Sequence, residues 1–169
     1  MKKKEKTIGL VMSIIISAAM GAISAFLVRK GNPDSTKTSP AFMMYFSNII
    51  LSVIVGIIVV FVIPLGKMGK ILASKFNARP MTMKFNLLNA IPLAVGNTII
   101  VSMVTSLYGI FMARSNAPDD VVEKLPPFFV MWISNWAKLL PPTLIVSYVL
   151  AVALAPIVVL AVGIKGTEE

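Results

Sequence analysis

Residues 42–65 read FMMYFSNIILSVIVGIIVVFVIPL, and no charged side chain interrupts them. About 20 apolar residues in a helix cross the roughly 30 Å hydrocarbon core of a bilayer. A helix also satisfies its own backbone hydrogen bonds in lipid, which an open strand cannot do. This stretch therefore predicts a membrane-spanning helix.

Three more apolar stretches of similar length occur at residues 7–28, 87–112 and 142–164. The whole chain agrees with them, being 57% hydrophobic and 14% charged with a mean hydropathy of +0.86. A soluble domain is about a quarter charged. We therefore predict an all-α integral membrane protein, a bundle of four spanning helices.

The 16 basic side chains outnumber the 7 acidic ones, but they gather at the ends of the apolar stretches. This distribution is typical of membrane flanks, so we expect no nucleic-acid partner. Residues 2–6 and the loop at 67–84 are the most basic, and the positive-inside rule assigns both to the cytoplasm. Both termini are then cytoplasmic, and we expect a bacterial plasma-membrane location.

The chain contains no Cys and no His, which excludes thiol chemistry and imidazole acid–base catalysis. Every Asp and Glu lies in a predicted loop or tail. Proton- and cation-coupled carriers commonly place such side chains inside the membrane. We therefore expect no enzyme activity, no metal site, no cofactor and no cation coupling through a buried acid.

The second half of the sequence repeats the first, so that residues 1–84 and 85–169 each predict one helical hairpin. Residues 40–48, PAFMMYFSN, align with residues 127–135, PFFVMWISN, at an offset of 87. At an offset of 85 the matched pairs are Ser13/Thr98, Ser17/Ser102, Phe26/Phe111, Arg29/Arg114, Pro33/Pro118 and Asp34/Asp119. Two spans per half predict parallel repeats, related by an axis along the membrane normal.

This pattern resembles small bacterial membrane proteins known only as a domain of unknown function, here as two units in tandem. Its elements are a Met/Ser-rich helix, a short outer loop, and a second helix that opens with an aromatic–polar segment and closes on Pro. The resemblance implies a plasma-membrane protein and implies no activity.

Small residues recur every four positions in each predicted span, which puts them on one helix face. They are Ser13, Ser17, Gly21 and Ala25; Ser52 and Gly56; Thr98, Ser102 and Ser106; and Thr143, Ser147, Ala151 and Ala155. Small faces allow membrane helices to approach closely, so we expect these faces to pack together. A polar lining for a solute path is the alternative.

The Ser-Asn pairs of the two halves, Ser47-Asn48 and Ser134-Asn135, are candidate ligand-binding residues together with Lys138. A carboxamide in hydrocarbon needs hydrogen-bond partners, so the two Asn side chains could meet at the axis between the repeats. In the alternative they lie at the outer headgroup boundary, where water satisfies them.

A segment at residues 127–140 precedes the last span and ends at Pro141-Pro142. Together with the last span it is too long for one untilted helix, so we expect it to bend or divide, with Pro141-Pro142 as the natural break. The segment is then either an interfacial helix with Lys138 reaching the headgroups or the first part of a broken membrane helix.

The loop at 66–84 has apolar residues at 68, 71, 72 and 76 among its basic residues, which predicts an amphipathic helix that is ended by Pro80. Anionic headgroups are its expected partner. We predict a protein that binds or transports a small solute or lipid at a polar site between the repeats, completed by a homo-oligomer. The alternative is an accessory membrane protein that docks a partner through its small faces and basic loop.

Overall fold

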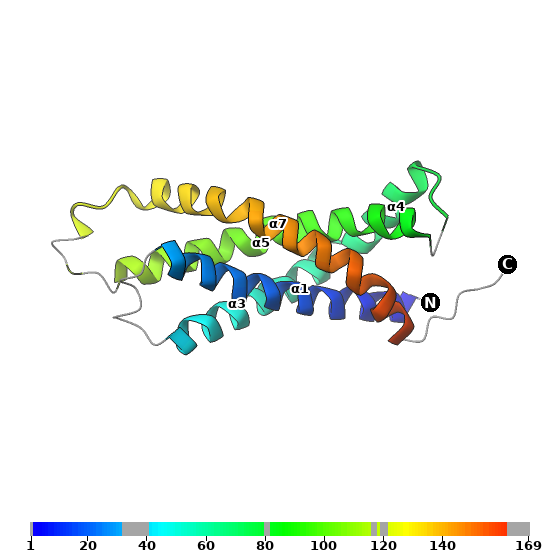
Figure 1. Ribbon diagram of the computed structural model, residues 1–169, viewed down its shortest axis with the longest axis horizontal. Coiled ribbons are helices and arrows are strands. Elements are labelled where there is room, and N and C mark those ends of the chain that lie inside the picture. Colours follow the sequence, from blue (N-terminus) through cyan, green and yellow to red (C-terminus); the bar gives the residue numbers. More distant parts are fainter. Residues whose placement is uncertain (1, 32–40, 80–81, 116–117, 119–121, 162–169) are drawn as a thin grey trace.

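The computed structural model describes residues 2–31, 41–79, 82–115, 118 and 122–161, and these ranges contain helices and no strand. The helices are α1 (Lys2–Gly31), α3 (Ala41–Val62), α4 (Leu65–Lys75), α5 (Met83–Ser115) and α7 (Phe128–Ala161) (Figure 1). All except α4 are long and apolar enough to cross a membrane, which confirms the predicted class. Pro33, Asp34, Pro80, Asp119 and residues 162–169 lie outside the described ranges.

Small residues line the helix contacts inside the bundle, and many large apolar side chains lie on its surface. All thirteen residues of the predicted small faces are buried, which confirms the packing prediction. Large apolar side chains point outward instead, such as Ile58 and Phe61 of α3 and Val149 and Leu160 of α7. Such an apolar surface needs a lipid solvent, and small residues at helix contacts are typical of packing in membranes.

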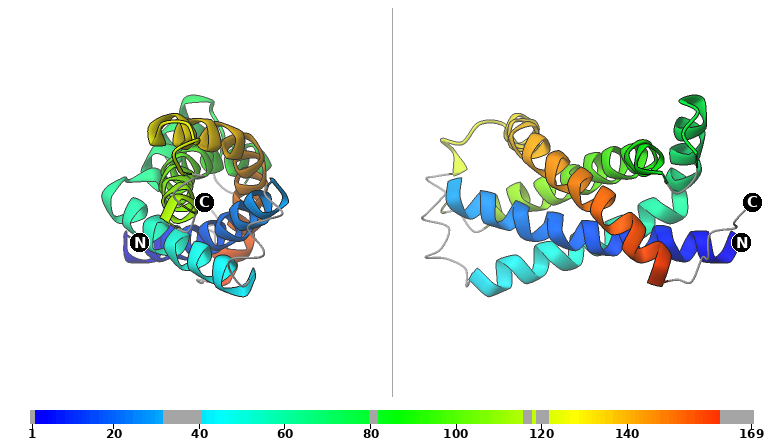
Figure 2. Two further views of the ribbon diagram at one scale, coloured as in Figure 1. Left: turned by 90° about the vertical axis from the view of Figure 1, so that its left-hand side faces the viewer. Right: turned by 45° about the vertical axis from the view of Figure 1, so that its right-hand side comes forward.

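Helices α1 and α3 pack along most of their length, and so do α5 and α7. The two pairs are joined because α1 also contacts α7 and α3 contacts α5. Figure 2 shows the four long helices gathered around one axis, with α4 at the end where α1 begins.

Two glycines allow α1 and α3 to approach closely. A Cβ atom at Gly21 would lie 2.7 Å from the backbone oxygen of Asn48 and 2.8 Å from Cα of Ile49. A Cβ atom at Gly56 would overlap the side chain of Ser17. Glycine is therefore required at both contacts, as in other close pairs of membrane helices.

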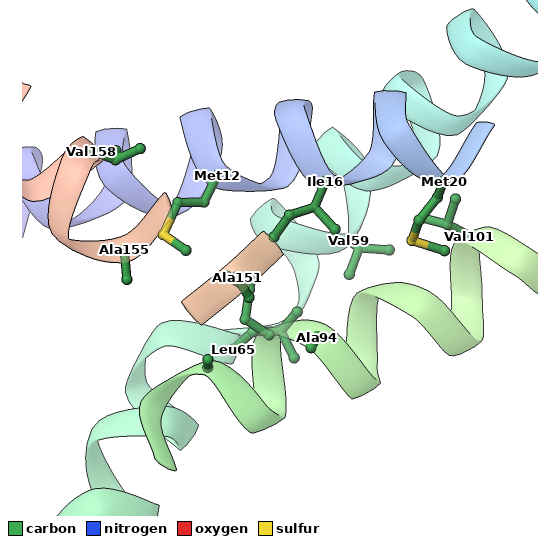
Figure 3. Packing of buried hydrophobic residues seen from close by; sticks show 12 residues of the cluster. Met12, Ile16, Met20, Val59, Leu65, Ala94, Val101, Ala151, Ala155 and Val158 are labelled. Atoms are coloured by element: carbon green, nitrogen blue, oxygen red, sulfur yellow. The ribbon is translucent and has the colours of Figure 1, made fainter. Parts of the chain in front are cut away.

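An apolar cluster fills the part of the bundle nearer α4. Met12, Ile16 and Met20 of α1 lie on one side of their helix and face residues of the neighbouring helices, including Ala94 and Ala151 (Figure 3). All five are at most 6% exposed. The cluster ties both helix pairs into one bundle.

The predicted amphipathic helix exists as α4, but it ends earlier than expected. Asn77 adopts φ 52°, and the N–H groups of Asn77 and Ala78 donate to the carbonyls of Ser74 and Ala73. This arrangement is a Schellman motif, which satisfies the last carbonyls and stops the helix. The predicted stop at Pro80 is therefore wrong, because local backbone capping ends the helix first.

Helix α4 packs on the bundle through Leu65, Gly69 and Ala73 and leaves other large apolar residues exposed. Gly69 and Ala73 are buried, and a Cβ atom at Gly69 would overlap the backbone of Asn89 in α5. Met68 and Ile71 stay exposed on the other side. Of the predicted apolar face, Met68, Ile71 and Phe76 are therefore exposed and Leu72 is half-buried, and a second face fixes the helix on the bundle.

Helix α7 is continuous through Pro141-Pro142, so the predicted break is wrong. The prolines cannot donate to the carbonyls of Ala137 and Lys138, but both of these residues are exposed. The Thr143 hydroxyl is buried within the same region and donates to the carbonyls of Leu139 and Leu140, at 2.7 and 3.0 Å. Its 34 residues span about 51 Å, and Figure 1 shows the helix crossing the bundle obliquely.

Candidate functional site

A buried polar cluster lies at the centre of the bundle around Asn97 of α5. The Asn97 amide donates to Oγ of Ser17 at 3.0 Å, and Oγ of Ser13 lies 3.4 Å from its carboxamide oxygen. Thr98 and Ser147 share a hydrogen bond of 2.6 Å between α5 and α7. These side chains have no exposed surface, so the cluster holds three helices together without water.

A second polar cluster joins α5 to the first turns of α7. The Asn135 amide donates to Oγ of Ser106 at 3.0 Å, and the indole N–H of Trp136 donates to Oγ of Ser102 at 3.1 Å. The indole N–H of Trp132 donates to the Met103 carbonyl at 3.1 Å. Both tryptophans are thus fixed against α5. Their contacts set the rotation of α7 and therefore the direction of the face that carries Ser134 and Lys138.

That next face lines an open groove of about 300 Å³ at the end of the bundle opposite α4. Its polar lining is Ser134, Asn135 and Lys138, and its apolar lining is Ile110, Pro126, Val130 and Met131. An apolar hollow with a few convergent polar groups is the usual form of a ligand site. The groove is therefore our candidate functional site.

The only charge that lines the groove is positive. Lys138 is exposed and carries the only charge among the lining residues, none of which is acidic. The groove also lies beside the first residues of α7, where the helix dipole places a partial positive charge. Ser134 and Asn135 add neutral donors within the same turn. The arrangement fits an anion or a neutral ligand with oxygen acceptors.

The structure brings together Ser134, Asn135 and Lys138 and keeps Ser47 and Asn48 apart from them. Asn48 is 7% exposed and donates to the Met44 carbonyl of its own helix at 2.9 Å. The Ser47 hydroxyl donates to the same carbonyl at 3.2 Å. The two Asn side chains have different partners, and the groove is formed by the second hairpin alone.

Asn97 was not among the candidate residues, yet it is the most central polar side chain in the bundle. Sequence comparison of the halves gave it no weight because the first half has no matching Asn. Its position in the sequence could have identified it, because Asn97 lies near the middle of the apolar stretch 87–112. A carboxamide at that depth must find partners inside the protein.

Comparison with known proteins adds no second source of evidence. The chain matches no family model, no curated protein and no solved structure. The fold and the groove therefore define it as a multi-helix membrane protein with an open polar groove.

Proposed function

We propose that this protein binds a small anionic or polar ligand, a solute or a lipid headgroup, in the groove beside Lys138. The observation that carries the proposal is the meeting of Ser134, Asn135 and Lys138 in one open hollow. The groove is accessible from outside the bundle, whereas the polar cluster at Asn97 is closed. Because the groove is open and the cluster at Asn97 is closed, we propose that the ligand binds in the groove. Transport across the membrane would also require the closed core to open.

We also propose that the two hairpins are parallel repeats. Gly21 lies against Asn48 in the first half, and Ser106, 85 residues after Gly21, bonds Asn135, 87 residues after Asn48. The contacts of α1 with α7 and of α3 with α5 correspond to each other under the same twofold relation. Glycine at position 21 allows α3 to approach α1 closely, whereas Ser106 at the corresponding position of the second half binds Asn135 through its side chain.

The proposal also includes the membrane, the orientation and the oligomeric state of the protein. The protein lies in a bacterial plasma membrane with both termini and α4 on the cytoplasmic side, and it forms a homo-oligomer. The basic side chains Lys67, Lys70 and Lys75 on α4 support this orientation. Its exposed apolar face supports contact with a membrane containing anionic headgroups.

An accessory role is the second candidate function, and the packed core favours it. Each polar group at Asn97 has a partner, and no exposed surface remains there. A bundle of this kind is suited to a fixed scaffold that docks another membrane protein. Under this hypothesis the groove binds no small ligand.

A ligand screen on the purified protein in mild detergent separates the two functions. Soluble phosphates, sulfates, carboxylates, neutral sugars and short-chain lipids are added one at a time, and thermal unfolding is followed by circular dichroism. A ligand at about 100 times its dissociation constant stabilises the folded state by about 2.7 kcal/mol. We expect one class of ligand to raise the melting temperature of the wild type and to lose this effect in Lys138→Gln.

Lys30→Gln is the matched control for this screen. Lys30 is exposed at the end of α1, at the same end of the bundle, and does not line the groove. The control loses the same charge and keeps the groove intact. If no ligand distinguishes wild type from Lys138→Gln, the binding function is wrong and the accessory role replaces it.

A further inference from the structure

We infer that the ligand of the groove is an anionic phospholipid, held by its phosphate at Lys138 with its acyl chains along the neighbouring apolar surface. This inference rests on the proposed binding function and narrows its ligand class. It follows from the depth of Lys138 in the bilayer, the charge of the groove and the surface beside it.

The depth of Lys138 is fixed by the polar contacts of the core. Thr98 contacts Met20, which lies near the middle of the apolar helix Thr7–Lys30, and also contacts Ser147. Thr98 and Ser147 therefore mark the middle of the bundle. Lys138 lies about 14 Å along α7 from Ser147, close to half of the 30 Å hydrocarbon core. Because α7 crosses the bundle obliquely, the rise along the membrane normal is less than this length, and the long side chain of Lys138 extends its ammonium group toward the lipid phosphates.

The surface beside the groove is apolar and faces outward. Phe129 and Val130 of α7 are 64% and 51% exposed, and Phe111 of α5 is 59% exposed. A soluble anion has no use for these side chains, whereas acyl chains next to a bound phosphate cover them. The combination of one cation and an adjoining apolar surface therefore favours a lipid over a free anion.

The prolines of α7 add acceptors for a headgroup that carries hydroxyl groups. Pro141 and Pro142 lack the N–H groups that would bond the carbonyls of Ala137 and Lys138. Ala137 and Lys138 are both exposed. A carbonyl that lacks its helix donor can accept a hydrogen bond from a headgroup hydroxyl, so a phosphate headgroup with free hydroxyls suits this part of α7. Phosphatidylglycerol has this chemistry and is the probe of choice.

The chain contains two tryptophans, Trp132 and Trp136, and both lie on the groove helix, so their fluorescence reports on the site without labelling. The purified protein is placed in mixed micelles and titrated with phosphatidylglycerol or phosphatidylcholine carrying brominated acyl chains. One lysine near a membrane surface strengthens anionic lipid binding about fivefold. We expect quenching to reach half its maximum at about fivefold less brominated phosphatidylglycerol than brominated phosphatidylcholine.

The variants test the role of Lys138. Lys138→Gln should abolish the preference for phosphatidylglycerol, whereas Lys138→Arg and the control Lys30→Gln should retain it. Tryptophan emission and elution volume identify any variant that fails to fold, and Lys138→Arg keeps the test valid if Lys138→Gln fails. A preference that persists in folded Lys138→Gln overturns the inference.

Soluble glycerol phosphate separates the two sources of a phosphate. We expect it not to displace the brominated lipid at millimolar concentration. If it displaces the lipid, or binds in a Lys138-dependent way while the two brominated lipids quench equally, the ligand is a soluble anion. The lipid inference then fails and the proposed function stands. If neither probe depends on Lys138, both fail.

Discussion

Replacement of Gly21 by alanine tests the close approach of α1 to the backbone of α3. The added Cβ atom would lie 2.8 Å from Cα of Ile49 and 2.7 Å from the backbone oxygen of Asn48. Carbon atoms pack best at about 3.5–4.0 Å, so α3 must move by about 0.7 Å or more. Backbone atoms cannot rotate away as a side chain can, and the whole helix must shift.

Overpacking of this kind costs about 1–3 kcal/mol. Alanine in place of glycine recovers about 0.5–1 kcal/mol of helix propensity. We therefore expect Gly21→Ala to lower the free energy of unfolding by about 1–2 kcal/mol. The assay is reversible unfolding in mixed micelles of mild detergent and dodecyl sulfate, followed by circular dichroism and tryptophan fluorescence.

Gly109→Ala is the matched control, because Gly109 lies in α5 and nothing lies within 4 Å of an added Cβ atom. It should leave stability unchanged or raise it slightly through helix propensity. If Gly21→Ala behaves like Gly109→Ala, then α1 and α3 do not approach as described. The packing of Gly21 against the backbone of α3 would then be wrong.

Three further predictions concern the polar core and α4. Asn97→Ala should lower the free energy of unfolding by about 0.6–1.7 kcal/mol in the same assay, because it removes the bond to Ser17, and an unchanged value would contradict the central cluster. Gly69→Ala should release α4 from Asn89 and speed its amide hydrogen exchange, whereas Gly66→Ala, with open space around it, should not. Ile71→Gln should speed exchange of α4 in lipid nanodiscs if, as proposed, its exposed apolar side chain contacts the membrane, and equal protection in both proteins would refute that contact.

Three of the five candidate site residues line the groove, and the other two do not. Ser134, Asn135 and Lys138 were predicted from the repeat and from the segment before the last span, and they meet in one hollow. Their equivalents Ser47 and Asn48 were predicted by the same symmetry and lie elsewhere. Their partners differ, because Asn48 and Ser47 donate to the Met44 carbonyl of their own helix, whereas Asn135 donates to Ser106 of α5.

The two prediction errors in the helices have separate physical causes. At Asn77 a positive φ angle and two capping hydrogen bonds end α4, and such a cap gives a weak sequence signal without glycine. At Pro141 the lost hydrogen bonds are local, whereas the packing of Leu139 and Thr143 into the bundle acts along the whole of α7. Tertiary packing therefore kept the helix continuous.

The apolar stretches and the spacing of small residues were enough to predict a membrane protein with four long helices and the faces along which these helices pack. Apolar stretches longer than a bilayer is thick have few alternatives to a helix, and small residues at every fourth position can make only one face. The central position of Asn97, the continuity of α7 and the lining of the groove by one hairpin became visible only in the packed bundle. These features depend on small differences in the spacing between helices. That spacing is set by the packing of all four long helices together and not by any single stretch of sequence.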